Sequence, residues 1–291
     1  MTKAGPKLSP VISILNMKGG VGKTTISAHV FRHLYIRLGK STLLVDIDPQ
    51  FNLTQTIIPQ VLYEKHKQAR RTIQAVMEPA PTASIFTVTT GLGPPPDVDE
   101  VSVGLRHITS DKSINLSVIP GDFGLVKYSL ITDQAVLTPV RDRFLKFISE
   151  TRAKRDLICI DCNPSSSFLT LCALMASTHI LVPVRPDRYS ILGLDLLEQF
   201  INELPNLVPK PKLIVLLNGV PTRGYDPTVE NSLRAHPRFG PVTLSTVLHT
   251  TKLLEASPGY TGFATDKKQQ WRITPRISAV VDELGTHLGL S

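Results

Sequence analysis

Cysteine, tryptophan and long apolar runs are scarce in this chain. Its three cysteines in 291 residues cannot build the disulfide framework of a small secreted domain and favour a reducing compartment. No stretch approaches the roughly 20 apolar residues of a membrane-spanning helix. The segment before Pro10 is short and polar, so we expect neither a signal peptide nor an added DNA-binding domain there. These shortages exclude a disulfide scaffold and favour a cytoplasmic protein.

Two of the cysteines, Cys159 and Cys162, have the C-x-x-C spacing of some metal and redox sites. Cys159 lies inside an apolar, strand-like run, and residues three apart in a strand point to opposite faces of the sheet. We therefore expect the two thiols to pack in the interior and not to converge on one metal ion.

Acidic residues are fewer than basic residues in this chain. The chain has 32 Lys and Arg against 24 Asp and Glu, which gives a formal net charge of +8 and a pI of about 9.4. Such a balance suits a polyanionic partner, either nucleic acid or an acidic membrane surface, without choosing between them. The length allows one large α/β domain with a substantial core.

A glycine-rich stretch, Met-Lys-Gly-Gly-Val-Gly-Lys-Thr-Thr at 17–25, follows a strand-like run at 10–16 and precedes a helix-like run at 26–38. This setting is typical of a phosphate-binding loop, because glycines let successive backbone N–H groups curl around phosphate oxygens and the helix dipole adds positive charge. In such a loop Lys23 would reach the β- and γ-phosphates, and the Thr24 hydroxyl would hold Mg²⁺.

Two further apolar strands end in acidic residues. The run that begins at Ser41 ends in Asp46 and Asp48, and the run 156–161 ends in Asp161, a Walker B pattern. Parallel strands bring their carboxyl ends to one edge of a sheet, so these acids should meet the phosphate loop there. Asp161 would orient the waters around Mg²⁺.

Alternating strands and helices predict an α/β fold, a doubly wound and mostly parallel sheet with helices on both faces. Further strands are expected at 116–120, 177–184, 212–218 and 241–247. Helices are expected at 63–76 (with a basic cluster at Lys65, Lys67, Arg70 and Arg71), at 139–155 with Thr138 as N-cap, at 190–204 with Ser190 as N-cap, and at 276–290.

The strand and helix patterns are weaker in the middle of the chain. Residues 57–111 contain many prolines and glycines, and we expect an ornamented insertion there within a single domain that spans 1–291. The lone tryptophan, Trp271, is expected to be a packing residue.

One position of the loop departs from the usual pattern. Met17 stands where a glycine is expected, and Lys18 comes directly before the paired glycines. This resembles the deviant Walker A loop of the ParA/MinD ATPase family, whose signature lysine touches nucleotide across a dimer interface. The order of the loop and the two acidic strands is similar to that of a short ParA-type partition ATPase over most of the chain, and least so over 57–111.

The resemblance implies ATP and Mg²⁺ as cofactors. Asp48 is similar to the residue that positions the attacking water, and Asn218 to the residue that reads adenine, with 250–256 flanking the base. Thr25 would lie at the α-phosphate. The implied sites are catalytic residues Lys18, Lys23 and Asp48; nucleotide-binding residues Lys18, Gly19, Gly20, Val21, Gly22, Lys23, Thr24, Thr25 and Asn218; and metal-site residues Thr24, Asp46 and Asp161.

Two positions differ from the family pattern. A Pro-Pro-Ser run usually follows the Walker B acid, where this chain has Cys162-Asn163-Pro164-Ser165, and a glycine is common where Phe51 follows Gln50. Both positions lie beside the switch regions, so they bear on hydrolysis and switching and not on ATP binding.

The implied function is an ATPase that forms a homodimer on ATP, binds nonspecific DNA and is stimulated by a ParB-like adaptor to segregate or position plasmid, chromosome or protein cargo. It would be cytoplasmic and associated with the nucleoid. Candidate DNA contacts are Lys267, Lys268, Arg272, Arg223 and Arg238.

Two alternatives stay open. The first is a MinD-like membrane-associated ATPase; the apolar stripe of 277–288 suits a helix, but Asp282 and Glu283 lie in its middle and disfavour anionic lipid. We therefore expect this helix to pack on the domain and expect no stable membrane association. The second is a metabolic or metal-handling enzyme of the same P-loop superfamily, which would need a substrate pocket or a convergent cysteine pair.

Overall fold

Strand β1 (Val11–Ile14) lies in the middle of the sheet, and all of its residues are buried. The structure is a computed structural model that describes residues 8–79, 84, 86–89, 93–107, 114–205, 207–254, 263 and 268–290. Within these residues the sheet has eight strands in the order β3-β4-β2-β5-β1-β6-β7-β8. β1 pairs in parallel with β5 (Leu157–Asp161) and β6 (His179–Val184), which belong to the two halves of the sheet.

The sheet confirms the predicted fold class. Strands β2 (Thr42–Asp46), β4 (Asn115–Ile119), β7 (Lys212–Val220) and β8 (Leu248–His249) all pair in parallel with their neighbours β5, β2, β6 and β7. Only β3 (Val103–His107), among the described strands, runs antiparallel, at the edge beside β4.

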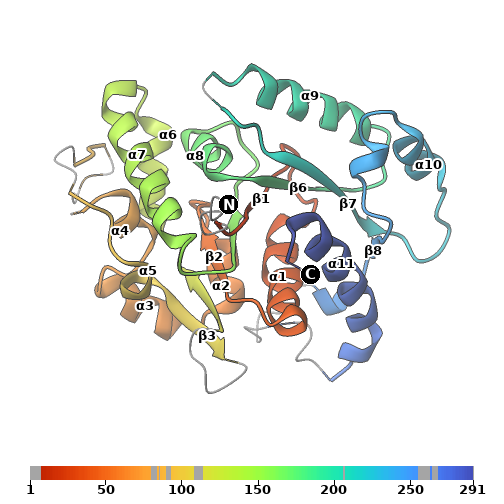
Figure 1. Ribbon diagram of the computed structural model, residues 1–291, viewed down its shortest axis with the longest axis horizontal. Helices are drawn as coiled ribbons and strands as arrows, with labels where there is room; N and C mark the ends of the chain where they lie inside the picture. Colours follow the sequence, from red (N-terminus) through yellow and green to blue (C-terminus); the bar gives the residue numbers. More distant parts are fainter. Residues whose placement is uncertain are drawn as a thin grey trace, which may run out of the picture.

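Helices cover both faces of the sheet, as Figure 1 shows. Alternate residues of a strand face opposite sides, so Val11 enters one core and Ile12 the other. Cys162 belongs to the first core and Cys159 to the second, which confirms that the two thiols do not converge. The first core is covered by α7 (Gln134–Thr151), α8 (Phe168–Ala176) and α9 (Ser190–Glu203), and the second by α1 (Lys23–Leu38) and α11 (Thr274–Leu288).

Helix α11 packs along α1, as predicted for the C-terminal stripe. Arg37 of α1 donates two hydrogen bonds, of 2.5 and 2.7 Å, to the carboxylate of Asp282. Glu283 accepts hydrogen bonds from two backbone N–H groups of the loop before β8. Among the helices that the structure describes, none is long and apolar enough to cross a bilayer.

The single helix predicted over 63–76 is wrong. The chain forms α3 (Gln60–Gln68) and α4 (Ile73–Met77), separated by a turn in which Arg70 has a φ of 56°. A left-handed residue cannot continue a right-handed helix. The other short helices are α2 (Asn52–Ile57), α5 (Val98–Val101), α6 (Lys127–Leu130) and α10 (Thr228–Ala235).

Both predicted N-caps are also wrong. Helix α7 begins at Gln134 because the Asp133 side chain accepts a 2.8 Å hydrogen bond from the N–H of Ala135, which leaves Pro139 inside the helix. Ser190 is the first residue of α9, and its hydroxyl donates to the carbonyl of Arg185.

The strand predicted over 241–247 is wrong. The chain forms a 3₁₀ turn at Gly240–Val242 and only an isolated bridge between Val215 and Thr243. Pro241 has no N–H to donate to a strand ladder, and the Thr243 hydroxyl bonds back to the carbonyl of Phe239 at 2.7 Å.

Candidate functional site

The glycine-rich turn lies between β1 and the start of α1. Gly20 and Gly22 have φ angles of 71° and 90°, which glycine adopts at little cost. A Cβ added to Gly19 or Gly20 would meet no heavy atom within 4 Å. The N-cap residue of α1 is Gly22, which has no side chain to cap the first N–H groups of the helix. The turn therefore leaves backbone donors and open space at the positive end of a helix dipole, which fits a phosphate group.

The two lysines of the turn point in different directions. Lys23 is 7% exposed, and its Nζ donates to the carbonyls of Asn16 and Lys18 at 3.1 and 3.3 Å. Burial lowers the pKa of Lys23, against the opposing effect of the Asp161 charge. The Lys18 side chain is 53% exposed, and its Nζ lies 2.5 Å from Oδ2 of Asp187. Lys23 thus belongs to the turn itself, whereas Lys18 lies at the surface.

Asp161, the last residue of β5, contacts the first turn of α1. It accepts hydrogen bonds from the hydroxyl of Thr24 at 2.9 Å and from that of Ser27 at 2.6 Å. Burial raises the pKa of Asp161 to about 6, although these two hydrogen bonds act to lower it. A hydroxyl and a carboxylate beside the phosphate cradle fit Mg²⁺, which is commonly held by one or two protein oxygens together with phosphates and waters.

Asp46 is fully buried and faces helix α2. Its Oδ2 accepts hydrogen bonds from the backbone N–H and the hydroxyl of Thr54, at 2.9 and 2.7 Å, and Thr54 in turn accepts from the N–H of Gly121 at 2.8 Å. Burial and the charge of Asp161 raise the pKa of Asp46 to about 8. Asp46 therefore ties the end of β2 to α2 and to the segment after β4.

Asp48 lies in the turn after β2 and is 7% exposed. Its Oδ1 accepts a 2.9 Å hydrogen bond from the N–H of Gln50. Burial raises the pKa of Asp48, while the Gln50 hydrogen bond and the Lys23 charge oppose that effect. Asp48, Lys23 and Asp161 interact electrostatically, so the structure brings these three predicted residues together.

Phe51, at the position where the sequence pattern led us to expect glycine, has a left-handed backbone. Its φ and ψ are both 41°, a left-handed backbone that costs a non-glycine residue about 1–2 kcal/mol. Its ring stacks on Tyr63 with centroids 5.2 Å apart and planes at 15°. Such a pair contributes about 0.5–1.5 kcal/mol, enough to offset much of that cost.

Asn218 of β7 packs directly against the phosphate turn. Its Nδ2 donates to the carbonyl of Val21 at 2.7 Å and lies 2.3 Å from where a Cβ on Gly22 would be. The N–H of Thr250 donates to the carbonyl of Val220 at 3.0 Å, so 250–254 lies beside the end of β7. Residues 255 and 256 of the predicted base-flanking segment lie outside the described residues.

Sequence reasoning missed several residues that hold this site. Asn16 accepts from the N–H of Lys18 at 2.8 Å and donates to the carbonyl of Pro183 at 2.8 Å, which fastens the turn to β6. The hydroxyl of Ser27 donates to Asp161, and the hydroxyl of Thr54 donates to Asp46. Asn16 comes directly after an apolar run, and Ser27 comes three residues after Thr24, on the same face of the helix. These two signals could have pointed to both residues. No comparable signal marks Asp187.

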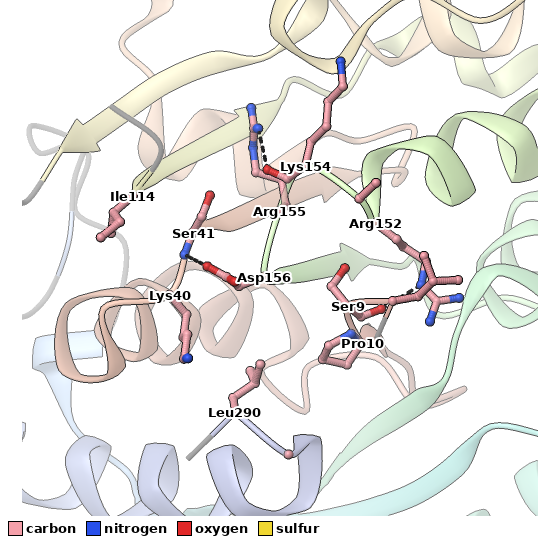
Figure 2. Close-up of a pocket in the computed structure, with 13 residues that line it drawn as sticks. Ser9, Pro10, Lys40, Ser41, Ile114, Arg152, Lys154, Arg155, Asp156 and Leu290 are labelled. Carbon is pink, nitrogen blue, oxygen red and sulfur yellow. Dashed lines mark hydrogen bonds between the residues drawn. The ribbon is translucent and has the colours of Figure 1, made fainter. Parts of the chain in front are cut away.

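A separate cavity of about 510 Å³ lies at the amino ends of the strands, opposite the ends that meet the phosphate turn. Figure 2 shows residues that line it. Pro10, Ser41 and Asp156 line it and directly precede β1, β2 and β5, whereas the phosphate turn follows β1. Asp156 accepts from the N–H of Ser41, and Arg152 donates to the carbonyl of Ser9, both at 2.7 Å. This cavity is therefore not part of the phosphate site.

The prediction that Trp271 packs inside is wrong. Trp271 is 67% exposed, because it lies in a short 3₁₀ turn, Gln270–Arg272, that has no buried residue. The Arg272 guanidinium lies 5.1 Å from its ring centroid. Lys268 is also exposed, so an aromatic ring and two cations share this stretch.

The other candidate DNA contacts differ in their surroundings. Arg223 is exposed. Arg238 forms ion pairs with Asp195 and Glu198, two carboxylates of α9. Lys267 lies outside the described residues.

The fold and the phosphate cradle define a P-loop nucleotide-binding domain, and comparison with known proteins agrees. A family described as "AAA domain" matches residues 9–213, which include the turn and all three acids. Sporulation initiation inhibitor protein Soj of Bacillus subtilis is 32% identical over 188 residues, 64% of this chain and 62% of Soj. The chain belongs to this family, and within it to the ParA/MinD group of P-loop ATPases.

Other relatives are longer. A candidate replication protein A of Rhizobium rhizogenes is 28% identical over 213 residues, which are 71% of this chain but only 46% of that protein. The chain thus spans less than half the length of this relative.

Solved structures share the fold over nearly the whole chain. A plasmid partition protein from Borrelia burgdorferi has a TM-score of 0.65 at 18% identity, covering 97% of this chain and 100% of its own. The pNOB8 ParA bound to nonspecific DNA has 0.63 at 20%, with 96% and 99% covered. Cobyrinic acid a,c-diamide synthase from Mycobacterium smegmatis, with bound ADP and magnesium, has 0.68 at 18%, with 96% and 95% covered.

Proposed function

We propose that this chain is a ParA-like ATPase that binds ATP with Mg²⁺, dimerises on it, binds DNA without sequence preference and hydrolyses ATP slowly. The observation that carries the proposal is the contrast between the two lysines of the phosphate turn, which point in different directions. Lys23 is enclosed by the carbonyls of its own turn, and Lys18 is exposed at the turn's outer side. An exposed lysine such as Lys18 can contact a nucleotide held by another copy of the chain.

The chain's own residues supply the binding chemistry. The N–H groups of 19–25 would hold the phosphates, Lys23 would neutralise the β- and γ-phosphates, and Thr24 with Asp161 would hold the metal. Mg²⁺, when bound, neutralises charge that develops on the phosphates. Asp46 supports this arrangement indirectly, since its oxygens already accept hydrogen bonds from Thr54 and from the N–H of Asp48.

Asp48 is the group that would orient the attacking water. It is largely buried, its carboxylate is held by the N–H of Gln50, and burial raises its pKa. Positioning and electrostatic stabilisation are the main contributions of a protein to phosphoryl transfer. The ATP between two copies then acts as a switch, because hydrolysis removes the γ-phosphate that both copies contact.

DNA binding would use phosphate-backbone contacts, which carry no sequence information. Lys268 and Arg272, beside the exposed Trp271, are the best-placed candidates, with Arg223. Arg238 is the weaker one, because two carboxylates balance its charge. We further propose that a ParB-like adaptor stimulates hydrolysis, that the protein works at the nucleoid, and that residues 57–111 elaborate a single ATPase domain.

The two alternatives have less support. A MinD-like role at membranes would use the C-terminal stripe, but Ile277, Val281 and Leu284 are buried against the domain. A metal-handling role would use Cys159 and Cys162, which lie in different cores. A metabolic role is represented among the structural neighbours by the cobyrinic acid synthase, at an identity that shows the fold alone.

A gel-shift or anisotropy assay of a random-sequence DNA duplex, with and without ATP and Mg²⁺, tests the proposal. We expect binding by the wild type only with ATP, a steep loss with salt, and loss of binding in Lys18→Ala and Lys23→Ala. Lys146→Ala is a matched control, since its side chain is 55% exposed, like that of Lys18, and lies on α7. ATP-independent binding by the wild type, or binding to anionic vesicles instead of DNA, would contradict the proposal.

A further inference from the structure

The turn that carries Asp48 is joined to Phe51 by its backbone. The N–H of Phe51 donates to the carbonyl of Asp48 at 2.8 Å, and the carbonyl of Phe51 accepts from the N–H of Gln55 at 3.1 Å, which begins α2. The Asp48 carboxylate accepts from the N–H of Gln50 inside the same turn. A change in the backbone of Phe51 must therefore move the peptide groups that orient Asp48.

The side chain of Phe51 is held from two sides. Its Cβ lies 2.6 Å from where a Cβ on Gly121 would be, so Phe51 fits against the segment after β4 only because residue 121 is glycine. Its ring stacks on Tyr63, which is itself 7% exposed and anchored on α3. Two elements outside the turn thus fix a backbone conformation that Phe51 would otherwise leave.

Space for the ring to move lies next to the stack. A cavity of about 370 Å³ is lined by Phe51, Tyr63, Thr54 and Ile58, among others. Thr54, on the wall of this cavity, also carries the hydrogen bonds to Asp46 and Gly121. The cavity therefore lies between the stacked rings and the residue that supports Asp46.

We propose that the Phe51–Tyr63 stack is a latch that holds Asp48 in position for hydrolysis, which makes both aromatic residues positioning residues. The inference rests on the proposed function. With the rings stacked, the left-handed turn is stable and Asp48 is oriented; with the rings apart, the turn relaxes and Asp48 loses its orientation while the phosphate cradle stays intact. The latch thus sets the rate of the switch without contributing to nucleotide affinity.

Tyr63 offers a matched pair of variants. Its hydroxyl is buried and has no hydrogen-bond partner among the described residues, so Tyr63→Phe keeps the stack and loses nothing else. Tyr63→Leu keeps an apolar side chain but removes the ring. We expect Tyr63→Leu to lower kcat for ATP about 3- to 10-fold, the factor that corresponds to a stacked aromatic pair, with KM within twofold of the wild type. Tyr63→Phe should retain the wild-type kcat.

Hydrogen exchange supplies a readout that needs no catalysis. In the nucleotide-free protein, the amides of residues 50–55 should exchange several-fold faster in Tyr63→Leu than in the wild type or Tyr63→Phe, while those of α1 should be unchanged. Phe51→Gly, which accepts the left-handed backbone but lacks the ring, should show the same loss of kcat.

The outcomes separate the two proposals. If the wild type hydrolyses no ATP, or if Asp48→Asn hydrolyses ATP at the wild-type rate, the proposed function fails, and the exchange data alone decide whether the stack holds the turn. If Asp48→Asn is inactive but Tyr63→Leu keeps both the wild-type kcat and the wild-type amide exchange of residues 50–55, the latch is overturned. A rise in KM with unchanged kcat in Tyr63→Leu would also overturn it.

Discussion

The ammonium group of Lys18 lies 2.5 Å from a carboxylate oxygen of Asp187 in the same chain. The two side chains are 53% and 35% exposed, and ion pairs in such positions contribute about 0–1 kcal/mol. The pair is therefore strong enough to hold Lys18 at the mouth of the phosphate turn and weak enough to give way to a more highly charged partner. In the proposed dimer, a nucleotide phosphate held by the second copy would be such a partner.

Replacing Asp187 should favour the dimer. In Asp187→Asn the amide oxygen can still accept from the N–H of Tyr189. Lys18 loses its ion pair, however, so it need not break one to contact another anion. We expect ATP-dependent dimerisation to tighten up to about 5-fold, the equivalent of a surface ion pair, as measured by sedimentation with a non-hydrolysable ATP analogue. Asp97→Asn, which removes the exposed ion pair with Lys154, is the control and should change nothing. A weaker dimer in Asp187→Asn would argue against competition for Lys18.

Gly22 should tolerate no side chain. Its φ is 90°, and a Cβ would lie 2.3 Å from Nδ2 of Asn218, so Gly22→Ala must displace either the turn or Asn218. We expect loss of ATP binding, measured by calorimetry, and a loss of at least about 1–2 kcal/mol of unfolding free energy from the backbone term alone. Gly193→Ala is the control: it lies in α9, where a Cβ meets no atom within 4 Å, and should stabilise by about 1 kcal/mol. Equal behaviour of the two variants would contradict the geometry.

The buried ion pair between Lys127 and Glu78 should matter for stability. Both side chains are at most 1% exposed, Nζ and Oε1 are 2.6 Å apart, and the Tyr128 hydroxyl donates to the same oxygen at 2.7 Å. Lys127→Met leaves a buried carboxylate without its cation and should cost about 3–5 kcal/mol in urea unfolding. Lys154→Met breaks an exposed pair and should cost at most about 1 kcal/mol. A loss below that of Lys154→Met would refute this account of the pair.

Stability should depend on pH through Glu283. Partial burial opposes its ionisation, but hydrogen bonds from the N–H groups of Thr246 and Ser245 outweigh that effect and lower its pKa below the ordinary 4.5. A lowered folded-state pKa stabilises the protein above the ordinary value, and the stabilisation is lost as pH falls through the lowered one. Glu283→Gln should therefore be less stable than the wild type at pH 7 by about 1 kcal/mol of unfolding free energy, and this difference should shrink as the pH falls through the lowered pKa of Glu283. A difference that persists in acid would point to packing instead.

The exposed stretch around Trp271 should contribute to DNA binding. Arg272→Ala and Lys268→Ala should each lower the slope of log affinity against log salt by about 1, if each cation contacts one phosphate. Trp271→Ala should weaken binding about 5-fold, within the range of an aromatic contact to nucleic acid, with the salt slope unchanged. Arg238→Ala is the comparison, because Asp195 and Glu198 already balance that charge. A larger effect at Arg238 than at Arg272 would move the interface elsewhere.

The parts of the fold that sequence predicts well are those with a strong local signal. Val11–Ile14 is a mostly apolar run that leads into the glycine-rich turn, and Leu157–Asp161 is an apolar run that ends in an acid, so their burial and order could be predicted. The 63–76 helix failed because the left-handed turn at Arg70 has no glycine to mark it. The N-cap at Asp133 was missed because Thr138-Pro139 offered the same signal one turn later.

The residues of the candidate site also divide into those with a local sequence signal and those without one. The turn that carries Lys18 and Lys23 is contiguous in sequence, and its motif predicts it directly. Asp187 and Thr54 reach the site through tertiary contacts, from a loop after β6 and from α2, and no spacing relates them to the motif. Phe51 was recognised as a departure, but its stacking on Tyr63 depends on the placement of α3, which the sequence did not predict correctly.

The most direct test of the central claim is the mass in solution of the wild type and Lys18→Ala, each saturated with a non-hydrolysable ATP analogue and Mg²⁺, measured by sedimentation with nucleotide binding confirmed in parallel. We predict a dimer for the wild type and a nucleotide-bound monomer for Lys18→Ala. A wild type that stays monomeric, or a Lys18→Ala that dimerises equally well, would contradict the claim that each copy lends this lysine to the other.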